Sequence, residues 1–193
     1  MKQPEKDSTG GVFAIFAGVC WIAWAIANGV THRGLENAAP GTFAAAANSF
    51  LTAGWNLLLI PGALRLYANY RGIHPRLLLA ATIAGILSLT LWAIGGLTHI
   101  SYLLETTYLV LAAFWLLVLG FTAKKNTRAF GYFTLTVAGF TSLDALFNLI
   151  GPVPFAVYVL AAPKLPLSAV WSLVVGTVLI QNSRSEAGGS VSA

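Results

Sequence analysis

The chain has 193 residues, of which 57% are hydrophobic and only 9% charged, and its mean hydropathy is +0.76. A soluble domain carries about 25% charged residues, so this composition excludes a water-soluble fold and leaves no room for a soluble catalytic domain. The net charge of +5 does not indicate nucleic-acid binding, because the basic residues stand at the ends of apolar segments. The chain is therefore predicted to be an integral membrane protein with the lipid bilayer as its first partner and no nucleic-acid partner.

The apolar segments predict transmembrane helices, each of which needs about 20 residues. Six segments qualify, and they cover residues 12–30, 43–67, 77–98, 102–123, 130–150 and 165–182. We therefore predict an all-α bundle of six transmembrane helices over residues 12–182. Residues 1–11 are expected to form an N-terminal tail, and residues 183–193, rich in Ser, Gly and Ala, a disordered tail.

The positions of the basic residues predict the orientation. If the N-terminus is cytoplasmic, nine of the eleven Lys and Arg residues fall inside, and only Arg33 and Lys164 fall outside. This bias predicts a multi-pass protein of a bacterial inner membrane with both termini in the cytoplasm. The alternative is that Ala25-Ile26-Ala27 ends a cleaved signal peptide, but Glu5 and Asp7 are unusual in such a leader.

An acidic residue, Asp144, lies inside the fifth segment. At 1.5 Å per residue it is about 21 Å from the start of that segment, within a hydrocarbon core about 30 Å thick. A carboxylate at this depth is expected to face the bundle interior and to be either protonated or paired. Thr141 and Asn148 share its helix face. Two interpretations remain open: a structural hydrogen bond to a neighbouring helix, or a functional group.

Asparagine and tryptophan residues recur on single faces of the first two segments. They predict either hydrogen bonds between helices or the lining of a ligand pocket. The tryptophans lie inside their segments, although membrane tryptophans usually lie at the interfaces. The candidate lining of a substrate or ion path is Asp144, Asn148, Asn56, Asn28, Trp21, Trp24 and Trp55.

Two further ionisable residues, His99 and Glu105, flank the short connection between the third and fourth segments. They are expected to form a solvated pair or to be acid–base partners of Asp144. The histidine spacing matches no metal motif, and no phosphate- or dinucleotide-binding fingerprint is present, so neither a metal nor a cofactor is expected. The single cysteine, Cys20, lies in an apolar run and is expected to be a buried structural thiol.

Residues 151–166 contain four prolines, which predict either a kinked extension of the fifth helix or a segment that re-enters the membrane. A weak internal repeat is also present, because Leu51–Leu57 and Leu143–Leu149 agree at four of seven positions. The two segments belong to the second and fifth predicted helices. An inverted 3+3 arrangement of this kind is typical of transporters.

These features favour a small transporter, a channel or a substrate-binding membrane subunit for a small or amphipathic solute. A second hypothesis is an intramembrane enzyme in which Asp144, with Glu105 or His99, performs acid–base chemistry on a lipid or isoprenoid. A third is a non-catalytic assembly or accessory protein. A small-molecule or ion ligand is expected as a partner. A homo-oligomer or a membrane partner is also expected, since Gly95-Gly96 and the alanines of 44–47 allow close helix contacts.

Overall fold

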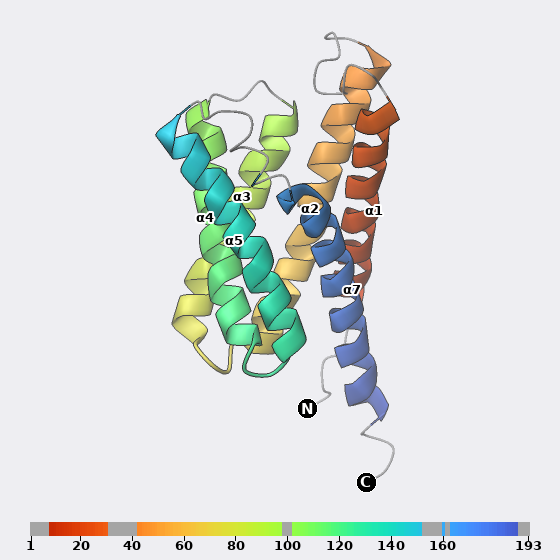
Figure 1. Ribbon diagram of the computed structural model, residues 1–193. Helices are drawn as coiled ribbons and strands as arrows, with labels where there is room; N and C mark the ends of the chain where they lie inside the picture. The colour runs from red at the N-terminus through yellow and green to blue at the C-terminus, as the bar shows by residue number, and fades with distance from the viewer. Residues whose placement is uncertain (1–7, 31–41, 98–101, 152–159, 161–162, 189–193) are drawn as a thin grey trace.

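The computed structural model is an all-helical bundle (Figure 1). It describes residues 8–30, 42–97, 102–151, 160 and 163–188. Over these residues the chain forms helices and no strands, namely α1 (Thr9–Val30), α2 (Phe43–Tyr70), α3 (Pro75–Leu97), α4 (Tyr102–Ala123), α5 (Arg128–Ile150) and α7 (Lys164–Gly188). Each predicted segment coincides with one of these helices, so the predicted fold class is confirmed.

Five of the helices, α1 to α5, are long and apolar enough to cross a membrane, which makes the chain a multi-pass membrane protein. The sixth helix, α7, has 25 residues but is less apolar. It begins below the upper ends of α1 and α2 and extends past the lower end of the bundle (Figure 1). The last predicted span is thus a helix that is shifted along the bundle axis and begins within the bundle.

Local sequence explains the helix ends. The Thr42 hydroxyl accepts a hydrogen bond from the Ala45 N–H at 3.3 Å and so caps the start of α2. At the end of α5, Gly151 has φ +99°, a conformation that favours glycine. Helix α7 continues to Gly188 because no glycine or proline interrupts it after Gly176. The helix therefore includes residues 183–188, which the composition assigns to a disordered tail.

The helices pack in the order α7, α1, α2, α3, α4, α5, and the ring closes where α5 meets α7. Glycines allow a close contact between α1 and α7. A Cβ atom on Gly176 would lie 2.6 Å from the Gly11 carbonyl oxygen. In contrast, α7 touches α5 and α2 at fewer places. Of the contacts between neighbouring helices in this ring, the one between α5 and α7 is thus the most loosely packed. It is called the α5–α7 seam below.

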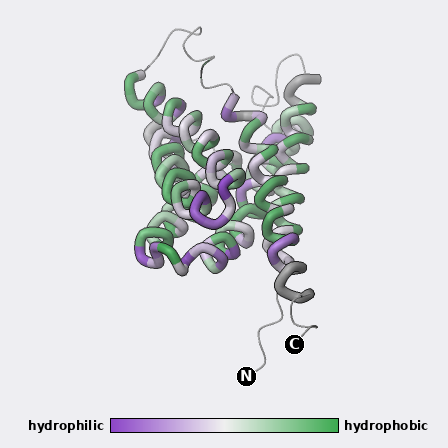
Figure 2. The backbone as a smooth tube through the Cα atoms, turned by 60° about the horizontal axis from the view of Figure 1, so that its bottom comes forward, coloured by the Kyte–Doolittle hydropathy of each residue, from purple (hydrophilic) through white to green (hydrophobic). Residues whose placement is uncertain are grey.

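The surface of the bundle suits a bilayer. Large apolar side chains such as Phe50 and Leu149 are exposed on the outer faces, and the hydrophobic colour in Figure 2 runs along the helices. Basic residues gather in and beside the two turns 71–74 and 124–127, at the end where α1 begins and α7 ends. At this end Lys125 Nζ lies 3.1 Å from His74 Nε2 and links the two turns. That this end is cytoplasmic, and that the membrane is a bacterial inner membrane, stays a prediction.

Candidate functional site

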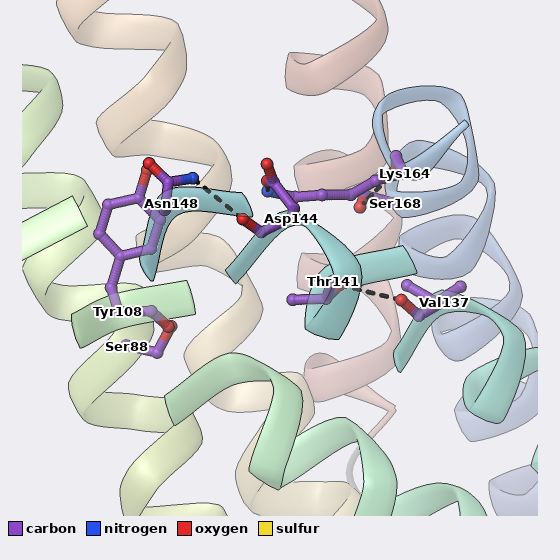
Figure 3. A network of polar contacts seen from close by, with 8 residues as sticks. All are labelled: Ser88, Tyr108, Val137, Thr141, Asp144, Asn148, Lys164 and Ser168. Atoms are coloured by element: carbon purple, nitrogen blue, oxygen red, sulfur yellow. Dashed lines mark hydrogen bonds and ion pairs between the residues drawn. The ribbon is translucent and has the colours of Figure 1, made fainter. Parts of the chain in front are cut away.

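The centre of the site is an ion pair across the α5–α7 seam. Asp144 on α5 and Lys164 on α7 are each only 7% exposed. The Lys164 ammonium donates a hydrogen bond to Asp144 Oδ2, and Figure 3 shows the two side chains pointing toward one another. Of the two states expected for Asp144, the structure shows the paired one. The sequence places Lys164 in the proline-rich connection of residues 151–166. In the structure it is the first residue of α7.

The position of Lys164 makes Asp144 necessary. A helix N-terminus carries a partial positive charge, so an ammonium on the first residue of α7 meets a field of its own sign. Burial adds the loss of hydration of the ammonium, which is costly in a bilayer. The Asp144 carboxylate opposes both effects, because it neutralises the ammonium and places a negative charge near the start of α7. Without the carboxylate, Lys164 would be an uncompensated buried charge.

Only one of the two Asp144 carboxylate oxygens takes part in the ion pair with Lys164. Its Oδ1 atom is buried and has no hydrogen-bond partner among the residues that the structure describes. The two polar neighbours predicted on the same helix face bond to the α5 backbone instead. Asn148 Nδ2 donates to the Asp144 carbonyl at 3.1 Å, and the Thr141 hydroxyl donates to the Val137 carbonyl at 2.9 Å (Figure 3). An unpartnered buried acceptor costs about 1–3 kcal/mol, so Oδ1 is a ready acceptor for a ligand donor.

An aromatic ring faces the same ammonium. Lys164 Nζ lies 5.1 Å from the centroid of the Trp92 ring on α3, within the range of a cation–π interaction. Trp92 stacks on Tyr108 of α4 with their ring centroids 4.6 Å apart and an interplanar angle of 19°. On another side the Trp55 ring meets Trp92 edge to face, with 5.1 Å between the centroids. Among the described residues, the ammonium therefore contacts a carboxylate and a fixed indole ring.

The rings continue from Trp92 into a row of four tryptophans: Trp92, Trp55, Trp21 and Trp24. The ring centroids are 6.3 Å apart between Trp55 and Trp21, and 5.5 Å apart between Trp21 and Trp24. At the end of the row, Trp24 Nε1 donates to Asn48 Oδ1 at 2.7 Å. The structure thus brings the three predicted tryptophans together. They connect to Asp144 through Trp92 and Lys164, which are not among the predicted site residues.

Other tryptophan contacts hold α7 in place. Trp55 Nε1 donates to the Ser172 hydroxyl at 3.3 Å, which ties α2 to α7. Trp171 Nε1 donates to the Thr134 hydroxyl at 3.0 Å, which ties α7 to α5. Trp171 also meets Trp115 edge to face, with 5.6 Å between the ring centroids. Hydrogen bonds between helices therefore exist in the described part of the chain, and the indole N–H groups of Trp24, Trp55 and Trp171 each donate one.

Asn56 lies apart from these contacts. It is completely buried, and its Nδ2 donates to the Thr52 carbonyl at 2.8 Å, while Oδ1 has no partner in the described part of the chain. Asn148, its counterpart in the predicted repeat, bonds to the carbonyl four residues earlier in the same way. The two matched asparagines share a local geometry, and the inverted repeat itself stays a prediction.

The remaining predicted residues are Glu105, His99 and Asn28. Glu105 is half-buried in the first turn of α4. His99 and the side chain of Asn28 lie outside the described residues. Within the described ranges, no group of three His, Cys, Asp or Glu residues could hold a metal ion. Cys20, expected to be buried, is half-buried and packs against the core.

The comparisons with known proteins add no relative. No protein-family model, no curated protein and no solved structure matches this chain. The ion pair and its aromatic surroundings are therefore the features of the molecule that indicate its function.

Proposed function

We propose that this multi-pass membrane protein is a small transporter or a substrate-binding membrane subunit, and that its solute binds at the ion pair between Asp144 and Lys164. The observation that carries the proposal is the pair itself, with one carboxylate oxygen unpartnered. Charged residues inside a membrane bundle are rare, and they commonly mark the paths of substrates and ions.

The surroundings of the pair support binding over a purely structural role. A buried ion pair that only joined two helices could be replaced by apolar packing with little loss of stability. In a purely structural pair, a buried acceptor without a partner, such as Asp144 Oδ1, would only lower the stability of the fold. The pair lies at the α5–α7 seam, which is more loosely packed than the contacts between the other neighbouring helices of the ring. Helix α7 begins within the bundle, and helix ends at membrane depth commonly form solute sites in transporters.

The same contacts favour binding over catalysis. An intramembrane enzyme of the kind predicted would bring a second acid–base group, Glu105 or His99, to Asp144. Among the described residues, the charged group that contacts the Asp144 carboxylate is the ammonium of Lys164. The tryptophan row beside it makes the surroundings of the pair aromatic and apolar, which suits the body of a compact amphipathic solute.

Thermal unfolding with a ligand panel tests the proposal. The purified protein is mixed at two pH values with metal ions, amino acids, vitamins, quinones and isoprenoids, and the melting temperature of each mixture is measured. A ligand that binds the folded state raises the melting temperature according to its concentration over its Kd. We expect at least one ligand to stabilise the wild type and not Asp144→Asn.

The matched control is Thr136→Val, which removes an exposed hydroxyl from the same helix that bonds only to the Tyr132 carbonyl. This variant should respond to the ligand as the wild type does. If no ligand distinguishes Asp144→Asn from the wild type, the pair is not a solute site and the accessory-protein hypothesis takes precedence.

A further inference from the structure

We infer that the solute of this site carries a primary ammonium group, and that Lys164 occupies the ammonium position when the solute is absent. This inference rests on the proposed function and specifies its substrate class. Lys164 would then be a tethered competitor for the site.

The contacts of Lys164 Nζ are those of an ammonium-binding site. The atom contacts one carboxylate oxygen, Asp144 Oδ2, and faces the Trp92 ring at 5.1 Å. A carboxylate together with an aromatic face is the combination that recognises organic ammonium groups. The Trp92 ring is held by Tyr108 on one side and by Trp55 on another, so the site exists before a ligand arrives.

Replacing one ammonium by another avoids the main penalty of opening a buried ion pair. The Asp144 carboxylate keeps a counter-ion throughout, so no bare carboxylate remains in the bundle. Lys164 can leave because its long stem starts at the first residue of α7, beside the exposed residues Pro163 and Pro166. From there a lysine head can reach toward the polar surface.

The unpartnered oxygen, Asp144 Oδ1, favours a primary ammonium, and the rings nearby favour an apolar body. Lys164 bonds to Asp144 Oδ2 and leaves Oδ1 without a partner in the described part of the structure. A free primary ammonium has three N–H donors and is not tied to α7, so it can donate to both oxygens. The half-buried ring of Trp92 then provides an apolar surface beside the ammonium for an aromatic or aliphatic body.

Three ligands with the same body separate the possible substrate classes: 2-phenylethylammonium, phenylacetate and 2-phenylethanol. Binding of each is measured as thermal stabilisation of the wild type, Lys164→Met, Asp144→Asn and the double variant. We expect 2-phenylethylammonium to bind the wild type and to bind Lys164→Met about tenfold more tightly, if Lys164 fills the site in about nine of ten molecules. Asp144→Asn and the uncharged double variant should not bind it.

A second measurement uses only the wild type, in case Lys164→Met does not fold. Lys164 should be protected from an amine-acylating reagent in the free protein. The ligand 2-phenylethylammonium should make Lys164 reactive by displacing it, when the reagent is given in a short pulse that leaves most of the ligand unmodified. Modification of the Lys164 peptide is quantified by mass spectrometry. If the modification of Lys164 stayed unchanged at saturating ligand, the proposed replacement of Lys164 by the ligand ammonium would be wrong.

Other outcomes distinguish the two proposals. If phenylacetate binds the wild type and Lys164→Met abolishes that binding, the solute is an anion. If only 2-phenylethanol binds, and Lys164→Met leaves its binding unchanged, the solute is a neutral donor. Either result overturns the ammonium inference and leaves the proposed function standing. If neither these ligands nor the broad panel binds, the proposed function itself fails.

Discussion

The substitution Asp144→Asn tests how much the buried pair contributes to the fold. The variant keeps the shape of the side chain but removes the counter-charge of Lys164, so the ammonium either stays buried unpaired or leaves the bundle and gives up its contact with Trp92. Removing one partner of a buried pair costs about 3–5 kcal/mol. For a protein of this size, 1 kcal/mol corresponds to about 2–4 °C in melting temperature, so the variant should melt about 6–20 °C below the wild type.

The double variant Asp144→Asn/Lys164→Met turns this prediction into a thermodynamic cycle. Because it removes both charges together, it should melt within about 4 °C of the wild type and recover most of the loss. Unfolding in detergent micelles can be followed by the fluorescence of the six tryptophans. The reasoning would be refuted if Asp144→Asn lowered the melting temperature by less than about 2 °C, or if the two single changes were simply additive.

Three further predictions concern packing, hydrogen bonding and orientation. Gly176→Ala should destabilise the protein by about 1–3 kcal/mol in the melting assay, since the new Cβ would lie 2.4 Å from an isoleucine side chain on α1. The control Gly139→Ala should be neutral or stabilising in the same assay, because its Cβ would have nothing within 4 Å. Trp171→Phe should lower stability by about 0.6 kcal/mol by removing one hydrogen bond across the α5–α7 seam, so a larger loss in chemical unfolding would show that indole packing dominates. In a Cys20→Ser background, Asn126→Cys in the turn between α4 and α5 should react with a membrane-impermeant maleimide only in inside-out vesicles, and labelling in intact cells would reverse the predicted orientation.

The helices were predictable because the bilayer constrains the sequence strongly. A span needs about 20 apolar residues, and every backbone polar group must bond within the helix, so hydropathy alone locates the segments. The main difference concerns α7, whose apolar run begins within the bundle and continues into a polar stretch. Hydropathy reports the length and composition of a helix but not its depth, and depth depends on packing, such as the close contact between Gly11 and Gly176.

The site was predictable only in part. Asp144 is recognisable because an acid inside an apolar segment requires a partner. The sequence places Lys164 in a proline-rich connection outside the membrane and gives it no role. Lys164 and Arg33 are the only basic residues predicted on that outer side. The need of Asp144 for a cation is therefore the signal that could have identified Lys164. Trp92 has no such signal, because its position over the ammonium depends on how α3, α4 and α7 meet.

The central claim is that the buried pair at the α5–α7 seam receives the ammonium group of a ligand. The most direct test is a titration of the wild type and of Asp144→Asn/Lys164→Met with 2-phenylethylammonium, followed by tryptophan fluorescence, since Trp92 adjoins the site. We predict a saturable change in the wild type and none in the double variant, at matched thermal stability. A saturable change with the same midpoint in both proteins, or no change in the wild type, would contradict the claim.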